Sequence, residues 1–173
     1  SSKGRGSFHF INNSINNFSV GIQMGGTGYQ LGADSIFVDN NIIYANDQGI
    51  NFYWAKYVEI TNNEMYKSVP MGTWWSNLNN IVNNISYGIV FNDNKIRGTE
   101  NALYVYTNPT NLAFPLFAEI KNNDIETGYR GIYLRGNPDL VTGNTFRDVV
   151  IENNKIIDSG TDPVNGTGIE LVN

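Results

Sequence analysis

The chain has 173 residues, a length that fits one domain, and a net charge of -5. This acidic balance argues against a basic nucleic-acid groove, and the sequence has no apolar run long enough for membrane insertion. The absence of cysteine excludes disulfides and thiolate metal sites, and a charged content of only 16% with abundant Asn and Gly favours strands and tight turns over helices.

A short pattern recurs along the whole chain. An Asn-Asn or Asp-Asn pair is followed nine positions later by Gly-Ile or Ala-Leu, and each half carries apolar residues at period two. The pairs are Asn12–Asn13 with Gly21–Ile22, Asn40–Asn41 with Gly49–Ile50, Asp93–Asn94 with Ala102–Leu103, and Asn122–Asn123 with Gly131–Ile132. Looser copies lie at 60–65, 141–146 and 151–156. Such a repeat of short strands predicts the coils of a parallel β-solenoid.

The first two coils are expected at 7–35 and 36–57. The alternation predicts inward side chains in the first coil, followed by a Gly-rich excursion over 25–33: Phe8, Phe10, Ile15, Phe18, Ile22 and Met24. In the second coil it predicts Phe37 or Val38 inward, and with them Ile42, Ile50 and Phe52, with Trp54 near the exit.

The third coil begins at Val58 and is interrupted after Met65 by an expected lateral loop near 66–80. The register around 81–87 is ambiguous, because residues 88–91 could close the third coil or open the fourth. The fourth should bury Ile96, Leu103 and Val105 and continue into a loop at 107–115.

The fifth coil, 117–136, is the best formed copy, with Ile120, Ile125, Ile132 and Leu134 inward and a further excursion after it. The last coil, 149–172, carries an insertion at 159–165 before a strand in which Ile169 faces in. The whole chain is thus expected to form one domain, 1–173, of about six coils. No sequence typical of a cap flanks these coils, which predicts a segment of a longer helix or ends that pack on something else.

Asn and Gly at fixed places in each coil have physical reasons. Asn tolerates left-handed backbone, and its amide both donates and accepts, so stacked copies can form a hydrogen-bonded ladder along the axis. Gly ahead of the second strand allows a sharp corner because it has no Cβ.

The phrases IFVDNNIIYANDQGINFY, IKNNDIETGYRGIYLRG and IENNKII resemble the repeats of right-handed parallel β-helix proteins of the pectin-lyase-like superfamily. This superfamily holds polysaccharide lyases, glycoside hydrolases, uronan epimerases and phage tailspike depolymerases. The resemblance therefore implies a right-handed solenoid, a polysaccharide partner and a place outside the cell or on a virion surface. A tailspike would also be a homotrimer. No cofactor is expected.

One outward column on the Gly-Ile strands suits sugar binding. Tyr faces can stack on sugar rings, while amides and guanidinium groups bind hydroxyls and carboxylates. With loops at 25–33, 67–80 and 107–115 as possible walls, the predicted substrate-binding residues are Asn51, Tyr53, Trp74, Trp75, Tyr104, Tyr106, Tyr133 and Arg135. The alternative is that outward Tyr residues only stabilise the sheet by stacking.

Glycoside hydrolysis needs two carboxylates, and Asp47, Glu100 and Glu126 each come shortly before a Gly-Ile or Ala-Leu strand. They are the candidate catalytic residues; alternatively they are solvated corner residues. A uronate lyase would need a cation, for which Arg130 and Arg135 are best placed.

The superfamily's paired-Asp and Gly-His-Gly hydrolase signatures are missing, as is a dense acidic cluster for calcium, so no metal site is expected. Two functions therefore remain open. One is a carbohydrate-active enzyme, and the other is a non-catalytic structural or receptor-binding segment of a phage tail fibre, tailspike or secreted adhesin. A purely structural solenoid that binds protein is a third possibility.

Overall fold

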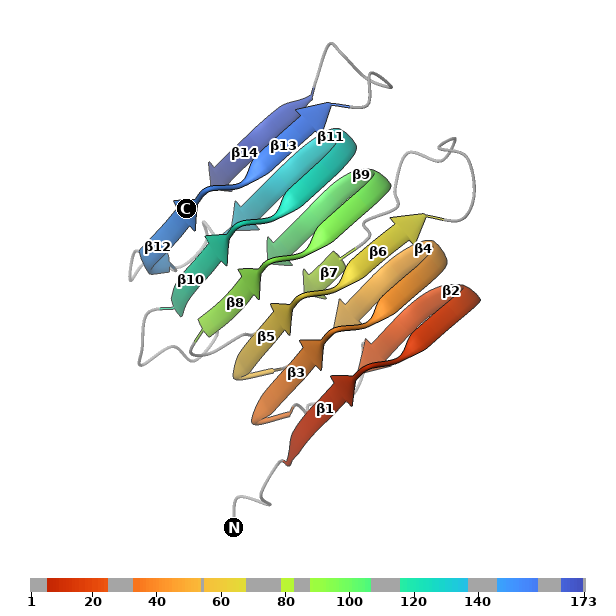
Figure 1. The fold of residues 1–173 in the computed structure, drawn as a ribbon. Coiled ribbons are helices and arrows are strands. Elements are labelled where there is room, and N and C mark those ends of the chain that lie inside the picture. Colours follow the sequence, from red (N-terminus) through yellow and green to blue (C-terminus); the bar gives the residue numbers. More distant parts are fainter. Residues whose placement is uncertain are drawn as a thin grey trace.

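The computed structural model describes residues 6–24, 33–53, 55–67, 79–82, 88–106, 116–136, 146–158 and 166–172. Within these ranges all regular secondary structure is β-strand, and every strand pair is parallel (Figure 1). The six-stranded sheet comprises β1 (Ser7–Ile11), β3 (Ser35–Asp39), β5 (Tyr57–Thr61), β8 (Gly88–Asn92), β10 (Leu116–Lys121) and β12 (Phe146–Glu152). No helix that could span a membrane is found among the described residues.

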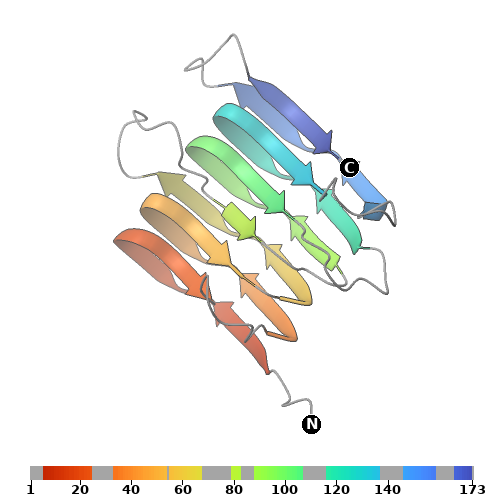
Figure 2. The same cartoon turned by 180° about the vertical axis from the view of Figure 1, so that it is seen from behind.

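The second sheet has eight strands, and four of them are long. They are β2 (Ser14–Met24), β4 (Ile42–Phe52), β6 (Glu64–Lys67), β7 (Asn79–Val82), β9 (Lys95–Tyr106), β11 (Asp124–Arg135), β13 (Lys155–Asp158) and β14 (Thr167–Val172). Figures 1 and 2 show the long strands curling back on themselves, and the pairing register shifts at this bend. Each long strand therefore has a first leg before the bend and a second leg after it.

Four repeats run unbroken from the six-stranded sheet through both legs: β1–β2, β3–β4, β8–β9 and β10–β11. In the other two repeats the legs are separate strands, β6 with β7 and β13 with β14. The chain is thus an all-β parallel solenoid of about four complete turns. β7 pairs with β4 and β9 in the third repeat, and β8 pairs with β5 and β10 and opens the fourth, so residues 88–91 belong to the fourth coil. Residues 83–87 lie outside the described residues.

The space between the sheets is filled by apolar side chains from both. Most predicted inward residues are buried, namely Ile22, Val38, Ile50, Phe52, Ile96, Leu103, Val105, Ile120, Ile125, Ile132 and Leu134. The choice between Phe37 and Val38 is resolved in favour of Val38, which is fully buried. Most of the residues that the period-two pattern placed inward therefore lie in the core.

The prediction for Ile42 was wrong. Ile42 is 44% exposed, and its neighbour Ile43 is fully buried, because Asn41 occupies an inward position and the alternation restarts after it. Phe8 and Phe18 pair with the buried residues Ile36 and Ala45 but are exposed, since β1 and β2 are the outermost strands of their sheets. Ile169 is exposed on the outermost β14 for the same reason.

The two residues of each Asn pair have different structural roles. The first member has left-handed backbone, as at Asn40 (φ 53°), Asn62 (φ 57°) and Asn122 (φ 57°), and Asp93 (φ 58°) serves equally well. The second member turns inward and forms the predicted ladder. Its Nδ2–Oδ1 distances are 2.9 Å from Asn13 to Asn41, 2.9 Å to Asn63, 3.1 Å to Asn94, 3.0 Å to Asn123 and 2.7 Å to Asn154.

The predicted conformational role of Gly before the second leg differs from the observed one. Neither Gly21 nor Gly131 has a positive φ. Instead, a Cβ on Gly21 would lie 2.6 Å from Ile43 Cγ2, and one on Gly131 would lie 2.6 Å from the carbonyl oxygen of Gly168. Glycine is needed here because the neighbouring coil approaches closely.

Candidate functional site

The second legs carry the outward row that the alternation predicts. Pairing aligns one residue from each repeat along the solenoid axis: Gln23, Asn51, Asn80, Tyr104, Tyr133 and Glu170. This alignment is confirmed. The interrupted third repeat contributes Asn80 at the corresponding position. A parallel neighbour row holds Val82, Tyr106, Arg135 and Val172, with Tyr53 directly after Phe52 of β4.

Tyrosine and arginine side chains of the two rows are in contact. The rings of Tyr104 and Tyr133 are tilted by 57° with centroids 5.1 Å apart. The Arg135 guanidinium lies 5.6 Å from the Tyr106 ring centroid. We call Tyr104, Tyr106, Tyr133, Arg135 and the adjacent Arg130 the Tyr–Arg cluster.

Arg130 is the best anchored member of this cluster. Its guanidinium carbon lies 4.3 Å from the ring centroid of Tyr129 and 4.5 Å from that of Tyr133, and its Nε bonds the Glu170 carboxylate at 2.5 Å. Two aromatic contacts and an ion pair fix the orientation of the guanidinium. Tyr129 was not predicted, although its place directly before Arg130 and Gly131 in the sequence is a usable signal.

Burial differs across the cluster. Tyr133 is only 7% exposed, Tyr104 is half-buried and Arg135 is exposed. Burial, and then the proximity of Tyr133, raises the pKa of Tyr104, so the phenol stays a hydrogen-bond donor. The phenols of Tyr133 and Tyr104 raise the pKa of Arg135, which remains a cation.

Asn51 adds an acceptor to the row. It is 5% exposed, and its Oδ1 atom is buried without a hydrogen-bond partner in the described part of the chain. A buried carbonyl oxygen normally has a donor. The Asn51 side chain therefore keeps one oxygen unpaired beneath the surface of the row.

The predicted catalytic carboxylates do not form one row. Asp47 and Glu100 lie three residues before Ile50 and Leu103, but Tyr129 holds that place before Ile132. Glu126 lies on a first leg instead, where its carboxylate is 3.7 Å from Nε of Arg97. The equivalence of Glu126 with the other two was wrong, because Glu126 lies six residues before Ile132, whereas Asp47 and Glu100 lie three residues before Ile50 and Leu103.

The strands that carry Asp47 and Glu100 have one strand between them, so they are about 10 Å apart at ordinary strand spacing. Side-chain groups of three or more His, Asp or Glu that could hold a metal are not found within the described ranges. The predicted Trp74 and Trp75, and the predicted loops at 25–33, 67–80 and 107–115, fall wholly or mostly outside the described residues. Their role stays a prediction.

A second outward tyrosine pair lies on the first legs. Tyr44 and Tyr66 stack with ring centroids 4.9 Å apart and an interplanar angle of 14°. Around them, Glu64 bonds Lys95 at 3.5 Å, and Asp124 bonds Arg97 at 2.5 Å. The opposite charges around this tyrosine pair therefore neutralise each other within the protein.

No family model, no curated protein and no solved structure matches this chain.

Proposed function

We propose that this protein binds a carbohydrate polymer along the second legs of the eight-stranded sheet, with the Tyr–Arg cluster as the platform. The observation that carries the proposal is the register that places Tyr104 beside Tyr133 in one row and Tyr106 beside Arg135 in the next. The half-buried rings of Tyr104 and Tyr106 offer flat apolar faces for the C–H faces of sugars, and the buried Tyr133 supports Tyr104. Arginine offers planar donors for hydroxyls and carboxylates.

The rigidity of the platform supports the same proposal. The side chains stand on hydrogen-bonded strands, and Arg130 is held between two tyrosine rings and by Glu170. Little side-chain entropy is then lost when a ligand binds.

A polymer fits better than a single sugar because the platform repeats. Each coil contributes one residue to each row at a spacing of about 4.8 Å, so successive sugar units can meet successive coils. The repeat and the Asn ladder also support placing the chain with right-handed β-helix proteins of the pectin-lyase-like superfamily. As a member of that superfamily, the chain would form about six coils of a right-handed helix and would act outside the cell or on a virion surface.

Binding without chemistry is the form of this function that the geometry favours. Glu126 is paired with Arg97, and it occupies a different row from Glu100. A receptor-binding or adhesive segment needs only the platform, whereas a hydrolase needs two carboxylates about 5 to 10 Å apart beside the bound sugar. Hydrolase or lyase activity is therefore the second candidate.

The test uses the full chain and a panel of acidic and neutral polysaccharides, with binding measured by affinity electrophoresis. We expect the double variant Tyr104→Ala/Tyr133→Ala to bind its polysaccharide at least tenfold more weakly than the wild type. The matched control is Tyr44→Ala/Tyr66→Ala, which removes the stacked pair on the first legs and should bind as the wild type does. Melting temperatures of both variants show that each is folded.

Equal binding by the wild type and the Tyr104→Ala/Tyr133→Ala variant would overturn the proposal, as would no binding to any polysaccharide. The same incubations are assayed for new reducing ends and for unsaturated uronate absorbance. Either product, lost in Asp47→Asn or Glu100→Gln, would replace passive binding by hydrolase or lyase activity.

A further inference from the structure

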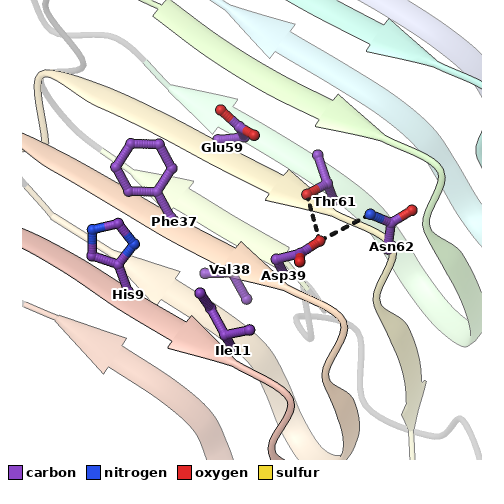
Figure 3. A pocket seen from close by; sticks show the side chains of 8 residues that line it. All are labelled: His9, Ile11, Phe37, Val38, Asp39, Glu59, Thr61 and Asn62. Carbon is purple, nitrogen blue, oxygen red and sulfur yellow. Dashed lines mark hydrogen bonds between the residues drawn. The ribbon is translucent and has the colours of Figure 1, made fainter.

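A hollow on the outer face of the six-stranded sheet lies apart from the Tyr–Arg cluster. It has a volume of about 370 Å³ and is built on β1, β3 and β5 (Figure 3). Its main side chains are His9, Ile11, Phe37, Asp39, Glu59 and Thr61. All six stand at alternate, outward positions of their strands. The first, second and third repeats thus each contribute two of them.

One side of the hollow is aromatic. The rings of His9 and Phe37 are stacked, with centroids 4.7 Å apart and an interplanar angle of 13°. Tyr57, two residues before Glu59 on β5, adds a third ring, whose centroid is 6.0 Å from that of Phe37. His9 is exposed and Phe37 is half-buried, so ring surface remains open to a ligand.

The other side carries two carboxylates that neutral donors hold in place. The Tyr57 hydroxyl donates to Glu59 Oε2 at 2.9 Å. Thr61 Oγ1 and Asn62 Nδ2 both donate to Asp39 Oδ1 at 2.9 Å (Figure 3). Burial and the Glu59 carboxylate raise the pKa of Tyr57 to about 12, which keeps its hydroxyl a donor.

Among the described residues no cation balances the negative charge of this hollow. In the described part of the chain neither Asp39 nor Glu59 forms an ion pair. Glu119, in the same row on β10, bonds Lys121 at 3.2 Å. The lining residues include no Lys or Arg. Two fixed carboxylates beside open aromatic surface therefore favour a cation.

We propose that this hollow binds an amino sugar unit whose protonated amine bonds the Glu59 carboxylate. The sugar ring would lie against Phe37, where its C–H face contacts the aromatic surface, and the charge of Asp39, diagonally across on the neighbouring strand, would add to the attraction of the ammonium group. The volume of about 370 Å³ suits one sugar ring better than a polymer segment of several units. The proposal does not rest on the function of the Tyr–Arg cluster, since it uses different residues on the other sheet.

The test titrates the full chain with a glucosamine tetramer and, as the matched ligand, its N-acetylated counterpart, using isothermal calorimetry. We expect binding of the amine form and at least tenfold weaker binding of the acetylated form. Glu59→Gln and Asp39→Asn remove charge while leaving an oxygen to accept the same hydrogen bonds. Each should weaken binding of the amine tetramer roughly three- to tenfold.

Glu119→Gln is the matched control variant, because its carboxylate lies in the same row and already pairs with Lys121. It should bind the amine tetramer as the wild type does. Phe37→Ala should weaken binding of the amine tetramer, and Tyr104→Ala should not. Melting temperatures of all variants show that they are folded.

Four outcomes would overturn the proposal. They are no binding of the amine tetramer, equal binding of the acetylated tetramer, unchanged binding by the double variant Asp39→Asn/Glu59→Gln, and equal or tighter binding of a tetralysine peptide. The last result would assign the hollow to basic peptides rather than to sugars. All titrations are repeated in the Tyr104→Ala/Tyr133→Ala background, so that these outcomes do not depend on whether sugars bind the Tyr–Arg cluster.

Discussion

Asn63 donates two hydrogen bonds to one side-chain oxygen atom of Asn94. The Oδ1 of Asn94 accepts both the backbone N–H of Asn63 at 3.0 Å and its Nδ2 at 3.1 Å, while Nδ2 of Asn94 reaches the carbonyl oxygen of Ile60 at 2.9 Å. Asn63 and Asn94 are each about 1% exposed. Each inner rung therefore satisfies polar groups of three repeats at the place where the sheets meet, with no water needed.

The first prediction is that Asn94→Ala destabilises the protein by about 2–4 kcal/mol. The substitution removes the acceptor of the buried Asn63 N–H, one of the three acceptors of Asn63 Nδ2 and the side-chain donor to the Ile60 carbonyl, and unpaired buried polar groups are costly. Urea denaturation of wild type and variant measures the change in the free energy of unfolding.

Asn13→Ala is the control for this experiment. Asn13 is an outer rung, is exposed, and uses its side chain only to donate to Ile11 and Asn41. Its loss should be at most about 1 kcal/mol, since water replaces the lost partners. Equal losses for Asn13→Ala and Asn94→Ala would mean that the ladder is not the source of the stability.

The fold could be predicted from the sequence because the same pattern of short strands and Asn turns recurs along the chain. The core residues follow from period two, and the Asn ladder follows from the recurrence of Asn at one place in each copy. Ile42 was misplaced since the inward Asn41 takes one core position and shifts the alternation by one residue. A period of two cannot show such a shift on its own.

The second prediction concerns the left-handed turn at Asn122, whose φ is 57°. Asn122→Val should cost roughly 1–3 kcal/mol, because a β-branched residue is strained in this conformation. Asn122→Gly should be within about 0.5 kcal/mol of the wild type, since glycine adopts this φ freely and the lost bond to Asp93 Oδ1 is exposed.

Urea denaturation of the two Asn122 variants checks the prediction directly. A valine variant as stable as the glycine variant would show that the turn relaxes to another conformation. It would also remove the reason why Asn or Asp stands first in the pair.

The third prediction uses two glycines that occupy the same row on neighbouring strands. A Cβ on Gly131 would lie 2.6 Å from the Gly168 carbonyl oxygen and 2.6 Å from Ile156 Cγ2, whereas a Cβ on Gly168 meets nothing within 4 Å. Gly131→Ala should therefore cost about 1–3 kcal/mol through overpacking. Gly168→Ala should be neutral or slightly stabilising. Thermal unfolding of both variants makes the comparison, and similar melting temperatures would contradict it.

The candidate site was only partly readable from the sequence. Alternation aligned Tyr104 with Tyr133, but Glu126 lies six residues before Ile132 and not three, so the sequence spacing already separates it from Glu100. The hollow at Phe37 and Glu59 escaped notice because its residues come from three repeats and differ from each repeat to the next. Recurrence reveals scaffold, whereas a site is made of what differs between copies.

The last prediction is a loss of stability at alkaline pH through Tyr57. Burial, and then the hydrogen bond and charge of Glu59, raise the pKa of Tyr57 to about 12, against about 10 in the unfolded chain. The folded state thus holds this proton more tightly. Its stabilising effect is complete below pH 10 and is lost as the pH rises from about 10 to 12.

Urea denaturation at pH 9 and pH 11 measures the free energy of unfolding of the wild type and of Tyr57→Phe. We expect the wild type to exceed Tyr57→Phe by less at pH 11 than at pH 9. Glu59→Gln removes one of the two causes and should show an intermediate loss. A gap between wild type and Tyr57→Phe that stays constant from pH 9 to pH 11 would mean that the Tyr57 phenol titrates alike in both states.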